Sequence, residues 1–424
     1  MNIKKPVVFL ILSFCVLTLF AGEEEKILLL KVGNRSLKDK VMDISGGKIY
    51  SALRGKPIPF QEMIREMAKS RFLYLGESHD SLLNHDIQLK VIQALHHRDR
   101  NLVIGIEMMP SSKQEILNKW SLGLLTPEEF LQEARWYVHW NLNFAYYQKI
   151  FLFAKENKIP LYALNAPRAL IHKIRLEGWE ALSDAEKELI PQPDLSHKEH
   201  RQLIRTIFES TPIPHPMKEK GLDMAFEGLY RAQSAWDEVM AHRADITARR
   251  EGKRMIVLAG SAHFLYNLGV NRRAYERNRL PFYTLVCVEV PEAKTVRVSR
   301  SLADFVWGIP EEGRPAYPSI GLRLKKVEGL DNLIIESQAI EGVAKGSDFQ
   351  KGDIILSVDE RRFLDINELR MYLARFQWGD EVRFRILRQG EIKEIDLKFI
   401  YKREADLSAM SSSIRSGEGF CKNE

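Results

Sequence analysis

Four apolar runs of the sequence end at polar side chains that could do chemistry. In chain order, the side chains that follow these runs are Glu77 and His79, Glu107, Asn165 and Arg168, and His263. Carboxylates and imidazoles can bind a divalent metal ion, and an imidazole that a carboxylate orients can act as a general base. One such residue after a strand is usually a solvated loop group. Four strands that end alike indicate a functional site.

The segments that must position these residues alternate between apolar runs and helical patterns. The runs read as buried strands at 72–75, 102–106, 161–164, 255–259 and 282–290. Strands that alternate with amphipathic segments predict an α/β fold, with a mainly parallel sheet flanked by helices and with long helical insertions. Such sheets bind ligands beyond the carboxyl ends of their strands. We therefore expect the polar side chains to converge in one crevice.

The first 21 residues have the pattern of a secretory signal. Lys4 and Lys5 precede an apolar run at 6–20, and the small residues Ala21 and Gly22 follow it. The run is shorter than the roughly 20 residues of a membrane-spanning helix. Residues 1–21 are therefore predicted to be a signal peptide, with an N-terminal anchor that associates with the membrane as the alternative. Both interpretations place the protein in a bacterial cell envelope, exported and either periplasmic or membrane-anchored.

The length and composition predict a globular protein of two domains. The 424 residues are 45% hydrophobic and 28% charged, with a net charge of +6. No zinc knuckle, RNP motif or long basic tract in the sequence argues for a nucleic-acid partner. The first domain is expected over 22–310 and the second over 318–402. Residues 403–424 are rich in serine and poor in apolar residues, which predicts a disordered tail.

The first domain resembles the ChaN-type haem-binding proteins, which share a superfamily with the Tiki metalloproteases and the erythromycin esterases. The resemblance rests on GESHD at 76–80 with His85 and Gln88, WNLNFAYYQKIFLFA at 140–154, NAPR at 165–168, QSAWDEVMA at 233–241, and AGSAH at 259–263. It implies a haem cofactor, a role in haem or iron uptake, and an oxygen ligand to the iron. The residues it implies are the candidate ligands Tyr147, Tyr146 and Tyr266, together with Arg168, His85 and His263.

The same crevice has a second interpretation, as the site of a metal-dependent hydrolase of the Tiki or esterase type. Its catalytic groups or ligands to a divalent metal would be Glu77, His79, Glu107 and His263. No HExxH spacing is present in the sequence, so the two interpretations stay open. A third interpretation makes this domain a scaffold for the C-terminal one. The oligomeric state is open too, and a homodimer is one alternative.

The C-terminal region from Pro318 to about residue 400 resembles a small, β-rich PDZ domain. The resemblance rests on IGLRL at 320–324, AKGSDFQKGDIILSV at 344–358 and the helical segment 364–376. It implies that an extended peptide, the C-terminus of a protein partner, adds to an edge strand and has its carboxylate held by backbone amides. The residues implied in peptide binding are Ile320, Gly321, Leu322, Leu369 and Leu373. The alternative is a small β domain that binds no peptide.

Overall fold

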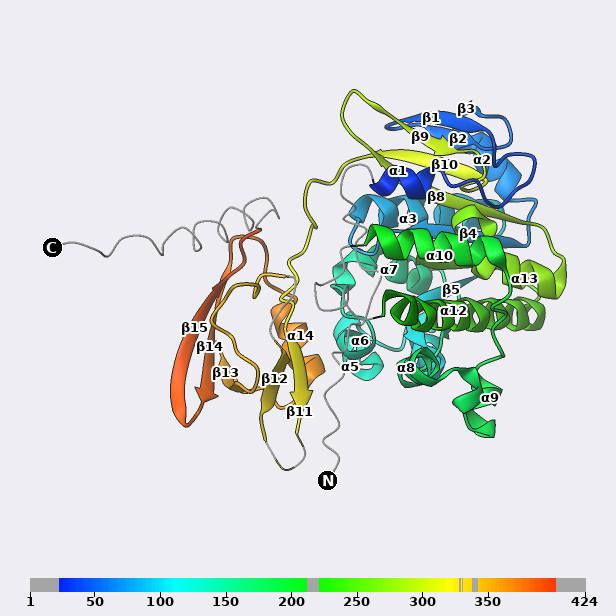
Figure 1. Ribbon diagram of the computed structural model, residues 1–424. Coiled ribbons are helices and arrows are strands. Elements are labelled where there is room, and N and C mark those ends of the chain that lie inside the picture. Colours follow the sequence, from blue (N-terminus) through cyan, green and yellow to red (C-terminus); the bar gives the residue numbers. More distant parts are fainter. Residues whose placement is uncertain (1–22, 212–220, 328, 330, 338–341, 402–424) are drawn as a thin grey trace. The chain divides into compact units, whose positions relative to one another are not determined.

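The computed structural model divides the described part of the chain into two compact units. It describes residues 23–211, 221–327, 329, 331–337 and 342–401 (Figure 1). The first unit contains the chain up to Ala134 and Phe144–Glu312, and the second contains Arg135–Asn143 and the chain from Gly313 onward. The predicted signal or anchor and the predicted tail lie outside the described residues. Among the helices that are described, none has the length and apolar character needed to cross a membrane.

An eight-stranded sheet in the order β3-β2-β10-β8-β4-β7-β5-β6 forms the centre of the first unit. Its strands are β2 (Ile49–Ser51), β3 (Lys56–Ile58), β4 (Phe72–Glu77), β5 (Leu102–Pro110), β6 (Leu161–Asn165), β7 (Arg254–Gly260), β8 (Phe282–Val290) and β10 (Phe305–Pro310). From β10 to β6 all neighbours are parallel, whereas β2 and β3 pair in antiparallel fashion. A separate pair consists of β1 (Val41–Ser45) and β9 (Thr295–Ser299). The predicted α/β fold is confirmed.

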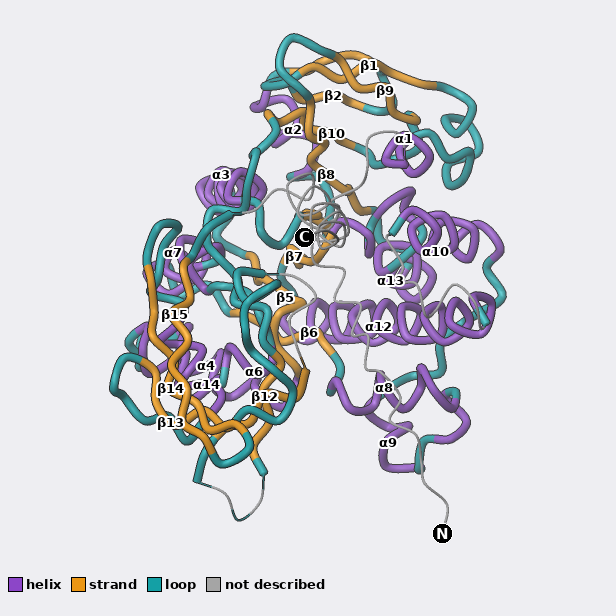
Figure 2. The backbone as a smooth tube through the Cα atoms, turned by 60° about the vertical axis from the view of Figure 1, so that its left-hand side comes forward, coloured by secondary structure: helices purple, strands orange, loops and turns teal. Residues whose placement is uncertain are grey.

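Helices surround this sheet and are contributed by every connection between its parallel strands except the last. They are α1 (Glu23–Leu28), α2 (Phe60–Met67), α3 (Leu82–Arg98), α4 (Gln114–Ser121), α5 (Pro127–Ala134), α7 (Gln148–Glu156), α8 (Arg168–Glu177), α9 (Asp184–Leu189), α10 (Lys198–Ser210), α12 (Leu222–Glu251) and α13 (Val270–Asn278). Figure 2 shows α3 and α7 on one side of the central strands and α10, α12 and α13 on the other.

The central strands are apolar because both of their faces are covered. All six residues of β4 are buried. On one face, Met240 and Ala244 of α12 join Phe72 and Val257 in a single core cluster. On the other face, α3 packs against β4 and α7. A parallel strand between two helical layers meets no water on either side, so its sequence reads as a continuous apolar run.

The order of the strands creates a switch point at the carboxyl edge of the sheet. The neighbours β7 and β5 are followed by connections to opposite sides, because β7 leads to β8 while β5 leads to β6. Ligands of α/β sheets bind at such points, where the diverging connections leave space beyond the strand ends. The strand order therefore predicts a ligand site beyond the carboxyl ends of β5 and β7.

The second unit is an antiparallel sheet of five strands with one helix. Its strands, in spatial order, are β11 (Arg323–Lys326), β12 (Leu333–Ser337), β13 (Ile354–Val358), β14 (Glu381–Arg388) and β15 (Glu391–Lys398). The helix α14 (Ile366–Leu373) packs with the sheet around a core that includes Leu369, Ile355 and Phe384. This confirms the expected small, β-rich C-terminal domain.

A segment from the middle of the chain, Arg135–Asn143, also belongs to the second unit, which the sequence did not predict. It contains the short helix α6 (Trp136–His139), which packs against α14. The backbone N–H of Tyr137 donates to Oδ1 of Asn367 at 3.0 Å, and its carbonyl accepts from Arg370 at 2.6 Å. These bonds tie the segment to the outer side of α14.

Candidate functional site

The carboxyl edge of the sheet brings together the polar residues that the sequence places after separate strands. Glu77 is the last residue of β4, and Glu107 lies within β5, where its pairing with β6 shifts register. His263 ends the short 3-10 turn that follows β7. Asn165, the last residue of β6, donates from its side-chain amide to the carbonyl of Glu107 at 2.9 Å. The predicted convergence is therefore present in the fold.

Glu77 is the most heavily bonded group of the site. Its Oε1 accepts hydrogen bonds from Nδ1 of His79 and from the hydroxyl of Tyr147, both at 2.9 Å. Its Oε2 accepts from the amide of Gln88 at 2.8 Å and lies 3.4 Å from Nε2 of His85. Burial raises the pKa of Glu77, but His85 and His79 outweigh this and hold that pKa well below its usual range. Glu77 is thus a buried carboxylate that stays ionised.

Glu107 and His79 face each other across the end of β7, where Gly260 leaves room for both. Oε2 of Glu107 accepts from the backbone N–H of Gly260 at 2.8 Å. A Cβ atom at Gly260 would lie 3.0 Å from Cε1 of His79 and 3.8 Å from Oε2 of Glu107. Burial lowers the pKa of His79, but the carboxylates of Glu77 and Glu107 raise it more, so that it lies above its usual value. Gly260, which has no side chain, therefore leaves room for the imidazole of His79 beside the end of β7.

His263 continues this network towards α12. Its Nε2 lies 3.4 Å from Oε1 of Glu107, and its Nδ1 lies 2.5 Å from Oδ1 of Asp237. Burial lowers the pKa of His263, but Glu107 and Asp237 raise it to about 10. His263 is therefore an imidazolium at neutral pH. Behind it, Nε2 of His200 lies 3.0 Å from Oδ2 of Asp237, and burial lowers the pKa of His200, which keeps that ring neutral.

Of the expected haem-binding residues, the structure gathers some and separates others. Tyr147 lies in the network through Glu77, and the ring of Tyr146 lies 5.9 Å from that of His85. Tyr266 instead belongs to the core beside α1, where its hydroxyl donates to the carbonyl of Ile27. Arg168 is exposed at the start of α8.

Four buried residues of the network were missed as site residues by sequence reasoning. They are Gln88, Asp237, His200 and Gln233, whose side-chain amide lies 2.9 Å from Nδ1 of His263. Gln88, Gln233 and Asp237 lie within the motifs quoted above, and this position was the signal available in the sequence. His200 has no such signal, because it lies in α10, remote in sequence from every strand end.

The residues expected to bind a peptide contribute largely to the core of the second unit. Leu322, Leu369 and Leu373 belong to its core cluster, and Ile320 packs against that cluster. Gly321 has a φ of 79°, in the left-handed region that favours glycine. The strand β11 is the edge of the sheet, with one side unpaired by other strands of the unit.

Among the residues that the structure describes, no group of three or more His, Cys, Asp or Glu side chains is arranged to hold a metal ion. The alternative of a divalent metal therefore has no support in the described part of the chain. The carboxylates of the network lie next to imidazoles instead, Glu77 beside His79 and Asp237 beside His263.

Comparison with known families shows to which family the first domain belongs. A profile described as "Haem-binding uptake, Tiki superfamily, ChaN" matches residues 63–274, half of the chain, and the profile of the PDZ domain matches residues 318–399. The chain belongs to the ChaN family. Its matched region contains every member of the network from Glu77 to His263, so the network is a feature of the ChaN domain.

Individual relatives of this ChaN-family chain are distant. ChaN of Campylobacter jejuni, solved with cofacial haem, is 18% identical, with a TM-score of 0.49 over 61% of this chain and 95% of that one. An erythromycin esterase mutant is 12% identical, with a TM-score of 0.35 over 60% and 83% of the two chains. Protein RETICULATA-RELATED 5, chloroplastic, from Arabidopsis thaliana is 25% identical over 158 residues, 34% of this chain. The chain spans about a fifth of that curated relative's length.

Proposed function

We propose that the protein binds ferric haem at the carboxyl edge of its sheet, with Tyr147 as the iron ligand. The observation that carries the proposal is the hydrogen bond from the Tyr147 hydroxyl to Glu77. Iron binds phenolate rather than neutral phenol, whose pKa is about 10 in water. Glu77, kept ionised by two imidazoles, accepts a hydrogen bond from the Tyr147 hydroxyl and so holds its oxygen in a fixed position.

The other groups of the site suit a haem in the same way. Tyr146, next to Tyr147, is a large aromatic side chain whose ring lies 5.9 Å from that of His85, and a macrocycle needs an apolar, aromatic surface. The imidazolium of His263 supplies positive charge towards a propionate or towards the ionised phenol. When bound, haem would bring redox-active iron to the site. Tyr147 has no exposed surface, so binding requires that its side chain be uncovered.

The decisive experiment is titration of the full chain with ferric haem, followed by absorption spectroscopy. The parent should give the spectrum of a high-spin ferric tyrosinate, and Tyr147→Phe should lose it, because phenylalanine keeps the ring and removes only the oxygen. Tyr266→Phe is the matched control, since Tyr266 is equally buried but lies in another part of the core. Parent-like binding by Tyr147→Phe would exclude Tyr147 and shift the assignment to Tyr146 or a histidine.

A hydrolase remains the second candidate, and the charge states of the site argue against its usual form. The pKa of His263 lies at about 10, so its ring holds a proton at neutral pH, and the neighbouring carboxylates raise the pKa of His79 as well. A protonated imidazole cannot act as a general base. A hydrolase on this site would have to use a carboxylate such as Glu107 instead. Ester hydrolysis without haem binding, abolished by Glu107→Gln, would support it.

We further propose that the protein is exported, that it serves haem or iron uptake, and that its PDZ domain recruits the C-terminus of a partner. Export rests on the basic and apolar pattern of residues 4–20. Peptide binding is supported by the edge position of β11, next to which α14 packs. Binding of peptides that end in a free carboxylate, but not of the same peptides with an amidated end, tests this.

A further inference from the structure

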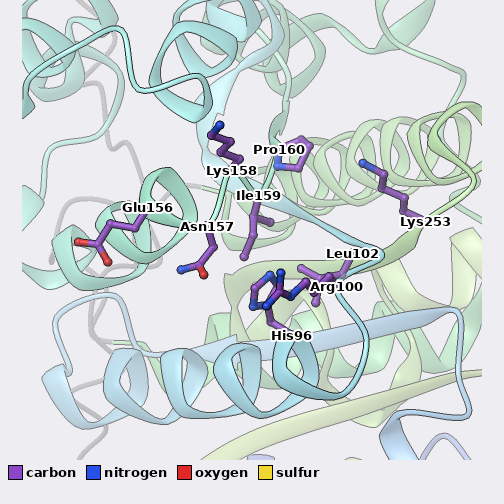
Figure 3. Close-up of a pocket in the computed structure, with 9 residues that line it drawn as sticks. All are labelled: His96, Arg100, Leu102, Glu156, Asn157, Lys158, Ile159, Pro160 and Lys253. Atoms are coloured by element: carbon purple, nitrogen blue, oxygen red, sulfur yellow. The ribbon is translucent and has the colours of Figure 1, made fainter.

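The edge of the sheet opposite the network holds a cavity of about 280 Å³ (Figure 3). Its lining residues are His96, Arg100, Leu102, Glu156, Asn157, Lys158, Ile159, Pro160 and Lys253. Leu102 is the first residue of β5, Pro160 immediately precedes β6 and Lys253 immediately precedes β7. The cavity therefore lies at the amino ends of the same strands whose carboxyl ends carry the network.

The charge of this cavity is mainly positive. Arg100, Lys158 and Lys253 line it, and in the described part of the chain none of the three has a carboxylate within ion-pair distance. Figure 3 shows Lys158 and Lys253 on loops and Arg100 close to His96, at the end of α3. Glu156 is the one carboxylate among the lining residues and is exposed.

Cations at this edge have one simple explanation. The helices α3, α7 and α12 all end here, and the C-terminus of a helix carries about half a negative charge, which favours basic side chains. Three such ends account for about one and a half charges. Basic residues in this place are therefore insufficient by themselves to indicate a ligand, and a separate observation is needed.

The separate observation is a pair of exposed leucines on the turn after α4. Leu122 and Leu124 are 68% and 66% exposed and flank Gly123, whose φ is 79°. Nζ of Lys155 donates to the carbonyl of Leu125 at 2.6 Å, which ties this turn to the C-terminal end of α7. Helix dipoles explain cations, but they give no reason to expose two large apolar side chains beside them.

The same turn is also fixed to the amino end of the sheet. The hydroxyl of Ser121, the last residue of α4, accepts a hydrogen bond of 3.1 Å from the backbone N–H of Leu161, the first residue of β6. The backbone N–H of Lys158 donates to the carbonyl of Lys155, whose side chain holds the leucine turn. The leucines and the cations therefore lie on one edge of the fold.

We propose that this amino-edge surface, defined by Leu122, Leu124, Arg100, Lys158 and Lys253, docks on an anionic lipid bilayer. Apolar side chains inserted at the headgroup boundary combined with cations that attract anionic lipid are the two contributions that hold a peripheral protein on a membrane. The cations that line the cavity would attract the headgroup phosphates. Because the network lies at the opposite edge of the sheet, docking would leave the carboxyl edge facing away from the lipid.

A local measurement on the full chain tests the proposal, because the apolar run at 6–20 could itself hold the chain on any vesicle. The rates at which Lys158 and Lys253 are acylated should be compared on vesicles of phosphatidylcholine, with and without phosphatidylglycerol. We expect anionic lipid to slow both rates several-fold at low salt and high salt to restore them, since salt screens surface charge. Lys48, exposed on the turn between β1 and β2, should react at the same rate on both vesicles.

Matched variants separate the two contributions. Leu122→Ser with Leu124→Ser should lose the protection of Lys158, whereas Leu53→Ser, at 75% exposure on another turn, should keep it. Arg100→Gln with Lys253→Gln should weaken binding to the anionic vesicles roughly 30-fold and so remove the protection of Lys158, because each cation near an anionic surface contributes about a five-fold gain in affinity.

Three outcomes would overturn the proposal. They are equal rates on both vesicles, equal protection by inorganic phosphate without any vesicle, and protection that survives removal of both leucines. Protection by inorganic phosphate alone would show that the cavity binds a free anion. Protection that survives removal of both leucines would show that the basic residues act without any apolar contact.

Discussion

The hydroxyl of Tyr147 donates a hydrogen bond of 2.9 Å to Oε1 of Glu77, although the two residues lie 70 positions apart in the sequence. The pair joins the end of β4 to the start of α7, since Tyr147 is the N-cap residue of that helix. The carboxylate thereby holds the hydroxyl oxygen of Tyr147 in a fixed position. This relationship leads to the first prediction.

Glu77→Gln should weaken ferric haem binding about 10- to 100-fold, the usual effect of removing a group that supports a metal ligand. Glutamine keeps the size of the side chain but removes the charge that pairs with His85 and His79, so the position of the Tyr147 hydroxyl is no longer held in the same way. Glu209→Gln, an exposed carboxylate on α10, is the control and should bind as the parent does. A Glu77→Gln protein that is folded by circular dichroism and binds haem normally at neutral pH would contradict the assigned role.

The charge on His263 should make stability fall in alkaline solution. Its pKa rises from the usual 6.5 to about 10 in the folded state. A raised pKa contributes stability that is fully present below pH 6.5 and is lost as the pH rises towards 10. We expect the free energy of unfolding to drop by a few kcal/mol across this range, measured by denaturant titration. In His263→Gln this part of the drop should vanish, and the exposed His97→Gln should retain it.

Gly260→Ala should displace His79. The added Cβ would lie 3.0 Å from Cε1 and 3.1 Å from Nε2 of that ring, tighter than most such contacts, so the ring must shift by a few tenths of an ångström. We expect a loss of about 1–3 kcal/mol in the free energy of unfolding, together with weaker haem binding. Gly46→Ala is the matched control, because nothing lies within 4 Å of its added Cβ. Equal stability of the two variants would show that the strand end adjusts without cost.

The second unit should depend on the segment that it receives from the middle of the chain. Asn367 is fully buried, and its Oδ1 accepts from the N–H of Tyr137. Asn367→Ala would leave that N–H without its acceptor, at a cost of about 1–3 kcal/mol. Hydrogen exchange of α14 should therefore accelerate in this variant. It should accelerate likewise in an isolated fragment 315–403, and a peptide of residues 135–143 should slow it again. Glu368→Ala, exposed on the same helix, is the control.

The sequence by itself determined the strands, the two kinds of domain and most of the network. A strand such as β4, whose apolar run ends at Glu77 and whose six residues are all buried, is covered on both faces, and a parallel sheet then places Glu77, Glu107 and His263 at one edge. These inferences hold because the burial of a strand, and the alternation of strands with helices that makes a sheet parallel, can both be recognised from local patterns in the sequence.

Only the tertiary structure decided which of these groups touch. It placed His200 of α10 behind Asp237, set Tyr266 apart from the site, and joined Arg135–Asn143 to α14. Each of these contacts links segments that are far apart in the sequence, and no local sequence pattern indicates which distant segments will be in contact. The charge states followed the same rule: burial and neighbouring charge together set the pKa of His263, and both exist only once the chain is folded.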